Sequence, residues 1–472
     1  MTVALARPIT CRFGHAIPRR WLAPTSPNHY SRRRIRANAI TIFAKALARS
    51  STADQNLDSP SVGLHPLAVS DDVELLIAGG GLTGLLLGAA CAGAGLTVAI
   101  VDRQDPAALL GEDFDGRCSA IAHGSRKVFD ALGLWADIAA HAEPILEIRV
   151  ADADSPLFLH YDHRQLGTSD PLGYIVENRV LRRALIERAR SIPNLNFLAP
   201  LTVGVVATSP LAAAVALSDE RQVTVRLVAA ADGQRSPLRR AAGIRSVEWQ
   251  YRQTGIVTTV RHERPHRGIA VEHFLPAGPF AILPMTGNRS SIVWTERAEL
   301  APRLIALSDA AFSAELAARF GDFLGTVEPV GPRWAYPLAL LLAERYVAPR
   351  LALVGEAAHM IHPIAGQGLN LGIRDVAALA ELVIDARRLG LDIGDYTVLQ
   401  RYQRWRRFDA LALAAVTDGL NRLFSNSIAP VRLARDVGLA AVDRLPPLKR
   451  LLMRDAMGLV GDLPRLVRGE PL

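Results

Sequence analysis

Three glycines and an acidic residue early in the chain have the spacing of a dinucleotide-binding turn. Gly79, Gly81 and Gly84 follow the pattern G-x-G-x-x-G, and Asp102 comes 18 residues after the last of them. In this pattern the first glycine makes a tight turn, the second lets a pyrophosphate approach backbone N–H groups, and the third lets helix pack on strand. Asp102 can accept hydrogen bonds from a ribose diol. The spacing predicts a nucleotide site, and the alternative is a packing turn without a ligand.

A second motif, Asp232-Gly233, follows an apolar run at residues 225–230 and precedes Ser236-Pro237. A strand that ends in Asp-Gly, with Ser-Pro at the next helix start, brings a carboxylate and flexible backbone to the carboxyl edge of a sheet. The alternative is a plain turn at Gly233, with Asp232 as a helix cap.

The third segment, residues 355–372, combines acidic, basic and glycine residues. Two histidines and a carboxylate within seven residues suggest a metal site, but Pro363 and the glycines break the helical spacing that zinc enzymes use, and no third ligand is evident. The alternative is a loop that passes a cofactor and starts a helix, whose N–H groups form a positive end. We therefore expect no metal, and a helix end that stabilises negative charge. The segment contains Glu356, His359, His362, Pro363, Gly366, Gln367, Gly368, Leu369 and Asn370.

Short buried strands are predicted before each motif. They cover residues 73–78, 225–230 and 351–354, while residues 85–94 and 367–374 are predicted helices and residues 97–101 a strand that ends at Asp102. This order of strand, turn, helix and strand predicts an α/β fold with a Rossmann-like unit.

The 27 uncharged residues from Leu75 to Val101 are long enough to cross a bilayer. Seven of them are glycine, and each glycine inside a helix costs about 1 kcal/mol relative to alanine. Division into two strands and a helix is therefore the better interpretation.

Two further regions have a clear pattern. Residues near 145–165 and 250–296 alternate apolar and polar side chains, which is typical of antiparallel strands with one covered face. Residues 430–468 hold eight basic and four acidic side chains, so this tail either lies on an anionic membrane surface or packs as a helix pair on the nucleotide-binding domain. The helix predicted at residues 402–422 has an apolar face made of Trp405, Phe408, Leu411, Ala412, Ala415 and Val416.

The formal net charge of +8 belongs to an N-terminal arm. Residues 1–53 hold nine Arg, one Lys and no acidic residue, and the rest of the chain holds 44 basic and 46 acidic side chains. A nearly neutral body argues against a nucleic-acid partner, which needs a basic patch on the folded domain. The arm has the composition of a mitochondrial transit peptide; the alternative is a start codon assigned too far upstream.

The three cysteines, Cys11, Cys91 and Cys118, are too few and too scattered for a disulfide framework or a zinc site. They favour a reducing compartment. We expect a bacterial cytoplasmic protein at the periphery of the inner membrane, or a protein on the matrix side of the mitochondrial inner membrane if the arm is a transit peptide.

Together the three motifs resemble the FAD-dependent aromatic hydroxylases, the flavoprotein monooxygenases similar to para-hydroxybenzoate hydroxylase. In that family a run G-D-A-A-H-x-x-x-P-x-x-G-Q-G-x-N binds the ribityl chain and the isoalloxazine ring. This sequence departs from the run once, at Glu356, whose longer carboxylate can still accept a hydrogen bond from a ribityl hydroxyl. Within the family the chain resembles the ubiquinone-biosynthesis hydroxylases from about Val73 to its end. The resemblance rests on residues 115–122, 131–135, 173–179, 278–284, 421–425 and 463–466.

The resemblance implies a Rossmann-like FAD-binding domain, an inserted antiparallel-sheet substrate domain and a C-terminal helical region. The FAD-binding domain would comprise residues 71–148, 174–244 and 340–405, the substrate domain 149–173 and 245–339, and the helical region 406–472, after an Arg-rich extension at 1–70. FAD contacts are expected from Gly79, Gly81, Gly84, Asp102, Arg117, Asp232, Gly233, Glu356, Gly366, Gln367, Gly368, Leu369 and Asn370. Leu283 and Pro284 would line the substrate cavity, and His359, His362 and Pro363 would line the site without an assigned proton transfer.

The implied reaction uses NAD(P)H to reduce FAD and O2 to hydroxylate the ring of a hydrophobic, polyprenylated phenol in ubiquinone biosynthesis. A second dinucleotide fingerprint is absent from the sequence, so NAD(P)H is expected to visit the FAD site transiently. The expected partners besides substrate and O2 are a ubiquinone-biosynthesis complex and a membrane surface. One alternative is a related flavoenzyme that acts on another aromatic or isoprenoid substrate, such as a reductase or a halogenase, although the W-x-W motif of tryptophan halogenases is absent. The other is a non-enzymatic membrane-associated protein.

Overall fold

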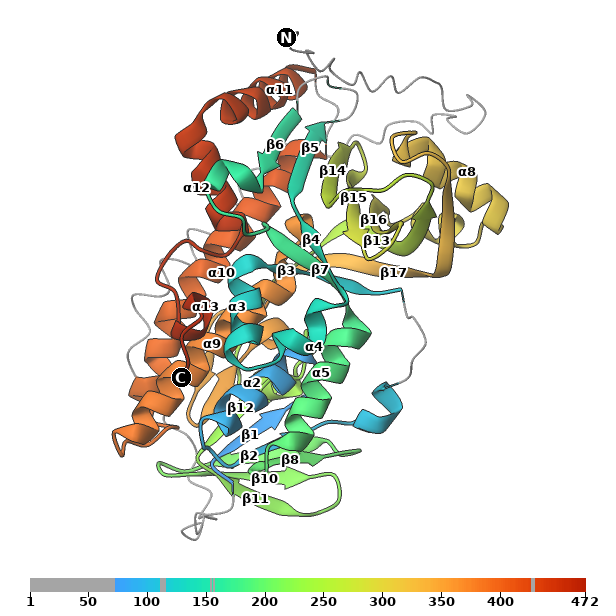
Figure 1. Ribbon diagram of the computed structural model, residues 1–472. Coiled ribbons are helices and arrows are strands. Elements are labelled where there is room, and N and C mark those ends of the chain that lie inside the picture. The colour runs from blue at the N-terminus through green and yellow to red at the C-terminus, as the bar shows by residue number, and fades with distance from the viewer. Residues whose placement is uncertain (1–72, 111–115, 153–154, 156–157, 426–428) are drawn as a thin grey trace, which may run out of the picture. The chain divides into compact units, whose positions relative to one another are not determined.

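The computed structural model describes residues 73–110, 116–152, 155, 158–425 and 429–472 (Figure 1). The N-terminal arm, with Cys11 and the expected extension at residues 1–70, lies outside the described residues. The described residues all belong to one compact unit. The division of this part into FAD-binding, substrate and helical domains stays a prediction.

A six-stranded sheet carries the three predicted motifs. Its strand order is β18-β19-β12-β1-β2-β8, and all neighbours are parallel except the edge pair β18–β19. The central strands are completely buried, which explains why they are continuous apolar runs in the sequence. The strands are β1 (Leu75–Ala78), β2 (Val98–Val101), β8 (Leu195–Leu198), β12 (Leu227–Ala230), β18 (Val347–Ala348) and β19 (Leu351–Leu353).

The 27-residue uncharged run forms β1, helix α2 (Leu82–Gly93) and β2. The predicted division of the run is thus confirmed, and the helix begins three residues earlier than predicted. Among the residues that the structure describes, no helix combines the length and apolar character needed to cross a membrane.

An eight-stranded sheet forms the second layer, in the order β20-β17-β13-β16-β15-β14-β5-β6. All neighbours are antiparallel except β14 and β5, which are parallel. Helix α8 (Asp309–Phe320) lies beside this sheet (Figure 1). One face of the sheet packs against the helix through Trp294, Phe312 and Leu316. The strands are β5 (Glu147–Asp152), β6 (Phe158–Asp162), β13 (Ser246–His262), β14 (Ile269–Leu275), β15 (Gly278–Met285), β16 (Arg289–Arg297), β17 (Val327–Ala343) and β20 (His359–Met360).

Two small antiparallel sheets complete the strands. The first, β3-β7-β4, consists of β3 (Cys118–Ala122), β7 (Gly173–Glu177) and β4 (Ala142–Ile145). The second, β11-β10-β9, was not expected from the sequence and consists of β9 (Val203–Thr208), β10 (Ala213–Leu217) and β11 (Gln222–Val225). The shorter helices are α3 (His123–Ala131), α4 (Trp135–Ala139), α5 (Asn178–Ser191), α6 (Pro237–Ala241) and α7 (Ala301–Ile305).

The C-terminal part is helical, as predicted. It contains α9 (Gln367–Arg388), α10 (Tyr396–Phe424), α11 (Ala429–Arg444), α12 (Pro446–Ala456) and α13 (Arg465–Arg468), and α9 is longer than the predicted 367–374. Helix α10 runs without interruption through the predicted domain boundary at 405/406.

Only part of the apolar set named for α10 is covered: Trp405 packs against the core around the six-stranded sheet. Phe408, Ala412, Ala415 and Val416 are exposed, and the buried face instead contains Tyr402, Arg406, Ala410, Ala414 and Thr417. Small alanines and an ion-paired arginine form the face that packs against α9, and apolar periodicity does not identify such a face.

Candidate cofactor and active site

The glycine turn after β1 combines two tightly packed glycines with one open glycine. Gly79 has φ +107°, and a Cβ there would lie 2.3 Å from the carbonyl oxygen of Ala231. A Cβ at Gly84 would lie 1.9 Å from the carbonyl oxygen of Gly79. Gly81 is exposed, and a Cβ there would meet nothing within 4 Å. Packing therefore requires Gly79 and Gly84, whereas the open space at Gly81 is where a ligand can approach the backbone.

Asp102 holds this turn from the end of β2. Its Oδ2 accepts a hydrogen bond from the Gly80 N–H at 2.6 Å, and its Oδ1 accepts one from the Gln104 N–H at 2.7 Å. Each carboxylate oxygen has two lone pairs, so both oxygens can still accept a bond from a ribose hydroxyl. Asp102 thus shapes the turn and keeps the capacity that the sequence predicts.

The helices that follow the two glycine segments begin without a side-chain cap. Gly81 is the N-cap residue of α2 and Gly366, with φ +61°, is that of α9. By contrast, α8 and α10 are capped by Ser308 and Asp395. Gly368 in the first turn of α9 is exposed, and a Cβ there would meet nothing within 4 Å. Unpaired N–H groups at an open helix start attract negative charge.

The two helix starts lie near each other. A Cβ at Gly355 would lie 3.1 Å from Cγ2 of Thr83, and a Cβ at Gly372 would lie 3.3 Å from Oγ1 of the same residue. Thr83 belongs to the first turn of α2, Gly355 ends the connection from β19, and Gly372 belongs to α9. The fold therefore brings the first and third sequence motifs together.

Two carboxylates near these helix starts lack full hydrogen bonding. Oδ2 of Asp232 accepts a bond from the Leu238 N–H at 3.3 Å, while its buried Oδ1 has no partner among the described residues. Burial raises the pKa of Asp232. Glu356 is exposed in the 3-10 turn η4 (Gly355–Ala357), yet surrounding protein is dense enough to raise the pKa of its carboxyl group. Hydroxyl donors would satisfy both groups, so these residues fit FAD, whose ribose and ribityl chain carry such donors.

His359 belongs to a buried ion-pair network. Its Nε2 lies 2.5 Å from Oδ2 of Asp375, and the other carboxylate oxygen, Oδ1, accepts a bond from Nε of Arg406 at 2.9 Å. The N–H of Gly355 also donates to Oδ2 of Asp375, at 3.1 Å. Burial alone would raise the pKa of Asp375, but His359 and Arg406 hold it below the ordinary value. His359 therefore fixes the loop.

Asp375 and Arg406 were not among the predicted site residues. The side chains of both are completely buried. Their burial depends on how α9 packs against α10. No motif or spacing in the sequence indicates it.

His362 is different from His359. It is completely buried, and neither ring nitrogen has a partner among the described residues. Its ring meets the Tyr251 ring edge-on, with 5.0 Å between the centroids. Burial lowers the pKa of His362 to about 4, so the ring is neutral at neutral pH. Pro363, the next residue, is exposed.

The side chains at the start of α9 hold the loop. Oδ1 of Asn370 accepts a bond from the Ala122 N–H at 2.8 Å, and its Nδ2 donates to the carbonyl oxygen of Ala120 at 2.9 Å. Nε2 of Gln367 donates to the carbonyl oxygen of Ala456 at 3.3 Å. Leu369 is half-buried and packs against the core around the six-stranded sheet. A cofactor at this helix start would therefore meet backbone N–H groups.

Arg117, Leu283 and Pro284 lie on or directly beside strands β3 and β15. The guanidinium carbon of Arg117 lies 5.8 Å from the centre of the Trp334 ring. Leu283 packs in the same apolar cluster as Ala120 of β3, and a Cβ at Gly366 would lie 2.8 Å from the Ala120 Cβ. Pro284 is buried on β15. The structure thus places β3, β15 and the loop before α9 side by side. Direct contacts of Arg117, Leu283 and Pro284 with cofactor or substrate stay predictions.

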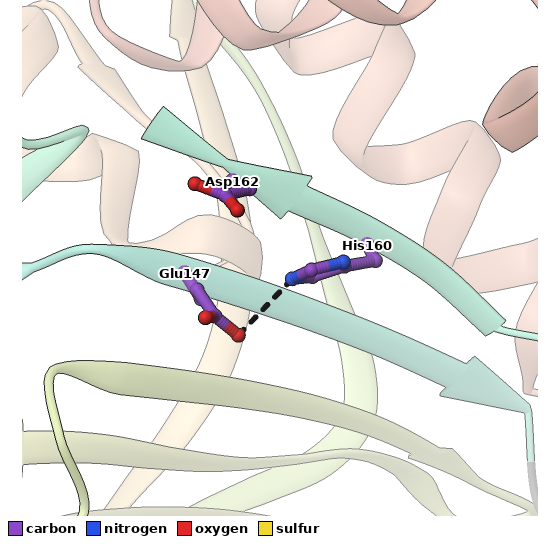
Figure 2. A group of neighbouring side chains, drawn as sticks. All are labelled: Glu147, His160 and Asp162. Carbon is purple, nitrogen blue, oxygen red and sulfur yellow. Dashed lines mark hydrogen bonds and ion pairs between the residues drawn. The ribbon is translucent and has the colours of Figure 1, made fainter. Parts of the chain in front are cut away.

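Figure 2 shows three residues whose types suit a metal ion, Glu147, His160 and Asp162, with ligand atoms within 4.8 Å of one another. Positive groups already engage both carboxylates. His160 Nε2 lies 3.0 Å and Arg149 Nη2 lies 2.9 Å from Oε2 of Glu147, and Nη2 of Arg164 lies 2.7 Å from Oδ2 of Asp162. The cluster is therefore an ion-pair network between β5 and β6, and we assign no metal to it.

Comparisons with known proteins give the class. The FAD binding domain family matches residues 72–408. A solved structure of p-nitrophenol 4-monooxygenase PnpA from Pseudomonas putida shares the fold, with a TM-score of 0.68 and 21% identity over 82% of this chain and 98% of that one.

The sequence comparison is more specific. The chain is 53% identical to the ubiquinone hydroxylase UbiL of Rhodospirillum rubrum, over 88% of this chain and 97% of the relative. It is 34% identical to the 3-demethoxyubiquinol 3-hydroxylase of Escherichia coli, over 82% of this chain and 98% of the relative. The chain belongs to the FAD binding domain family and, within it, to the ubiquinone hydroxylases. The predicted family, the α/β fold and FAD as cofactor are thereby confirmed.

Proposed function

We propose that this protein is an FAD-dependent monooxygenase that uses NAD(P)H and O2 to hydroxylate the ring of a polyprenylated phenol in ubiquinone biosynthesis. The observation that carries the proposal is the similarity to UbiL along nearly the whole length of that ubiquinone hydroxylase. The open, uncapped starts of α2 and α9 and the unpaired carboxylate oxygen of Asp232 support it, because they fit the phosphates and hydroxyls of FAD.

Bound FAD supplies the redox chemistry and the activation of oxygen. The chain supplies position and charge. The start of α2 would hold the pyrophosphate and Asp102 the adenosine ribose, while Asp232 and Glu356 would accept bonds from the remaining hydroxyls. The start of α9 would stabilise negative charge on the bound cofactor. The apolar clusters of the eight-stranded sheet exclude water from the reacting ring.

The purified protein should contain FAD and should consume NAD(P)H and O2 when a prenylated phenol is added. The phenol should gain one oxygen atom, which mass spectrometry measures. A colourless protein that binds no flavin would contradict the proposal. Consumption of NAD(P)H with reduction of the prenyl chain, and no gain of oxygen, would instead identify a reductase.

The hydrophobic substrate also needs access from a membrane, and we propose that α12 provides the contact. Four leucines on or beside this helix are exposed, at 36–52% of their surface, and Arg450 and Arg454 lie among them. Apolar side chains with neighbouring arginines suit a surface of anionic lipid. The leucines are Leu445, Leu448, Leu451 and Leu452.

The double substitution Leu451→Glu and Leu452→Glu should abolish binding to anionic liposomes while FAD content is unchanged. Leu391→Glu is the matched control, because Leu391 is equally exposed, at 54%, in the connection between α9 and α10. Unchanged liposome binding of the double variant would contradict the membrane proposal. Removal of the C-terminal helices would be a poorer test, because Phe424, Met453 and Leu466 belong to buried apolar clusters and their loss would expose these clusters.

We place the protein at the cytoplasmic face of a bacterial inner membrane, or on the matrix side of the mitochondrial inner membrane if the N-terminal arm is removed after import. N-terminal sequencing of the mature protein distinguishes the two. The exposed apolar face of α10, with Phe408 at 67% and Val416 at 56% exposure, is where we place a protein of a ubiquinone-biosynthesis complex. Phe408→Glu should then abolish co-purification of that protein, and unchanged co-purification would contradict this assignment.

A further inference from the structure

The strand β14 separates two environments in the eight-stranded sheet. Val271 and Leu275 pack with the cluster under α8. Ala270 and Phe274 point to the opposite face, where they belong to two other apolar clusters. Because side chains alternate along a strand, Glu272 lies on the same face as Ala270 and Phe274. This inner face carries a carboxyl group between two apolar neighbours.

Both apolar clusters border the loop that precedes α9. Phe274 stacks on Phe424, with 4.1 Å between the ring centroids, and packs in the same cluster as Ile364. Ile364 lies in the turn η5 (Ile364–Gly366), which leads into α9. The cluster of Ala270 contains Ala120, the residue that a Cβ at Gly366 would touch. Glu272 therefore lies between two groups of side chains that meet the predicted flavin loop.

The immediate neighbours of Glu272 in the sheet are apolar. It pairs with Ala281 on β15 and with Val150 on β5. Within the described part of the chain no hydrogen bond or ion pair reaches its carboxyl group. The side chain keeps part of its surface accessible, yet protein surrounds it so closely that burial raises its pKa to about 7. A carboxyl group that lines an enclosed space is expected to keep part of its surface accessible although protein surrounds it.

Two ionisable groups on this face of β5 and β6 have charged neighbours. Tyr161 of β6 lies near Asp443 and Asp455, and burial raises its pKa to about 12. Asp152 of β5 forms an ion pair with Arg435 of α11, at 2.8 Å, and both side chains are 2% exposed. A polar group that is buried without a partner costs free energy, and such groups concentrate at functional sites. Glu272 is the carboxylate of this face that has no charged partner among the described residues.

We propose that Glu272 recognises the hydroxyl group of the substrate phenol and accepts its proton during ring hydroxylation. The inference rests on the proposed function. In the proton transfer the phenolic O–H bond breaks, its electron pair stays on the oxygen, and a new O–H bond forms on the Glu272 carboxylate. The phenolate ring is richer in electrons and accepts oxygen more readily. The product phenol takes the proton back, so the carboxylate is restored without another reactant.

The test uses the FAD-loaded protein without NAD(P)H, so that no turnover occurs. A short-chain 2-prenylphenol and its methyl ether are titrated separately, and the change in flavin absorbance gives each dissociation constant. The ether keeps the shape but cannot donate a hydrogen bond. We expect the wild type to prefer the phenol by roughly ten- to a hundredfold, the range that a hydrogen bond to a charged group provides.

Glu272→Gln should bind the phenol about as weakly as the ether, with unchanged FAD content and unchanged ether binding. Glu272→Asp should keep part of the preference. The control is Glu299→Gln, at an exposed acid outside the inner face, which should behave as the wild type. The wild type alone provides a second measurement. Its preference for the phenol should fall as the pH is lowered through about 7, because protonation weakens the carboxyl group as an acceptor.

The outcomes separate the inference from the proposed function. If the FAD-loaded wild type prefers the phenol and Glu272→Gln keeps that preference, Glu272 does not recognise the hydroxyl group and the inference fails alone. A preference in the wild type that is independent of pH between 5 and 9 would also overturn it, even if the variant does not fold. If the FAD-loaded wild type binds neither compound, the inference and the proposed function fail together.

Discussion

Substitution of Gly81 by valine should separate FAD binding from folding. The backbone at Gly81 has φ −70° and ψ 179°, which valine adopts readily, and a Cβ would meet nothing within 4 Å. We therefore expect the unfolding free energy of the FAD-free protein to change by less than about 0.5 kcal/mol. The valine side chain would occupy the place of the pyrophosphate. Loss of one hydrogen bond to a charged group costs about 1.5–3 kcal/mol, so FAD should bind about ten- to a hundredfold more weakly.

Gly84→Ala provides the contrast within the same motif. Its Cβ would lie 1.9 Å from the carbonyl oxygen of Gly79, so α2 must shift. Overpacking of this kind costs about 1–3 kcal/mol, and this variant should lose stability even without FAD. Gly93→Ala at the end of α2 is the control, because a Cβ there meets nothing within 4 Å.

Urea unfolding of the FAD-free proteins measures the change in stability, and fluorescence titration with FAD measures the change in affinity. Normal FAD affinity in Gly81→Val would refute the assignment of the pyrophosphate site.

Three further predictions concern α9 and the loop that precedes it. Asp375→Asn should destabilise the protein by about 3–5 kcal/mol in urea unfolding, because the buried His359 and Arg406 both lose this carboxylate and Arg406 keeps only its ion pair with Asp409, whereas Glu315→Gln in the surface pair with Arg319 should cost less than about 1 kcal/mol. Since the pKa of Asp375 is lowered in the folded state, its stabilising effect is present at neutral pH and should fade below about pH 4. Burial lowers the pKa of His362 from its ordinary 6.5 to about 4, so the unfolding free energy of the wild type should fall by up to about 3 kcal/mol as the pH falls from 6.5 to 4. His362→Asn should remove this part of the pH dependence. Equal profiles of unfolding free energy against pH for the two proteins would contradict the burial of a neutral ring. Glu356→Ala should lower the FAD content of the purified protein, measured by absorbance, and full FAD occupancy would argue against its contact with the cofactor.

The nucleotide-binding half of the fold was predictable because its signals are local. Buried parallel strands are continuous apolar runs, and each run leads directly into a motif whose glycines have separate roles. The structure adds that Gly79 and Gly84 are required by packing, whereas Gly81 faces open space. The same spacing thus contains two kinds of glycine, which the sequence alone does not distinguish.

The residues that were missed depend on contacts between distant segments. Asp375 and Arg406 are 31 positions apart and meet only when α9 packs on α10. The buried side of α10 accommodates this charge and several alanines, which the apolar pattern of the helix does not indicate. Glu272 lay in a strand with ordinary alternation, and its position became informative only when its neighbours proved apolar. Sequence periodicity reflects the average polarity of one face of a helix or strand. It does not indicate which other segment packs against that face.

The central claim is that the protein transfers one atom of O2 to a phenol ring. The most direct test is a single reaction of the FAD-loaded enzyme with NAD(P)H, a short-chain 2-prenylphenol and isotopically heavy dioxygen, followed by mass spectrometry of the product. The account predicts a ring-hydroxylated phenol that carries one heavy oxygen atom for each molecule formed. A product without the heavy atom, or oxidation of NAD(P)H that leaves the phenol unchanged, would contradict it.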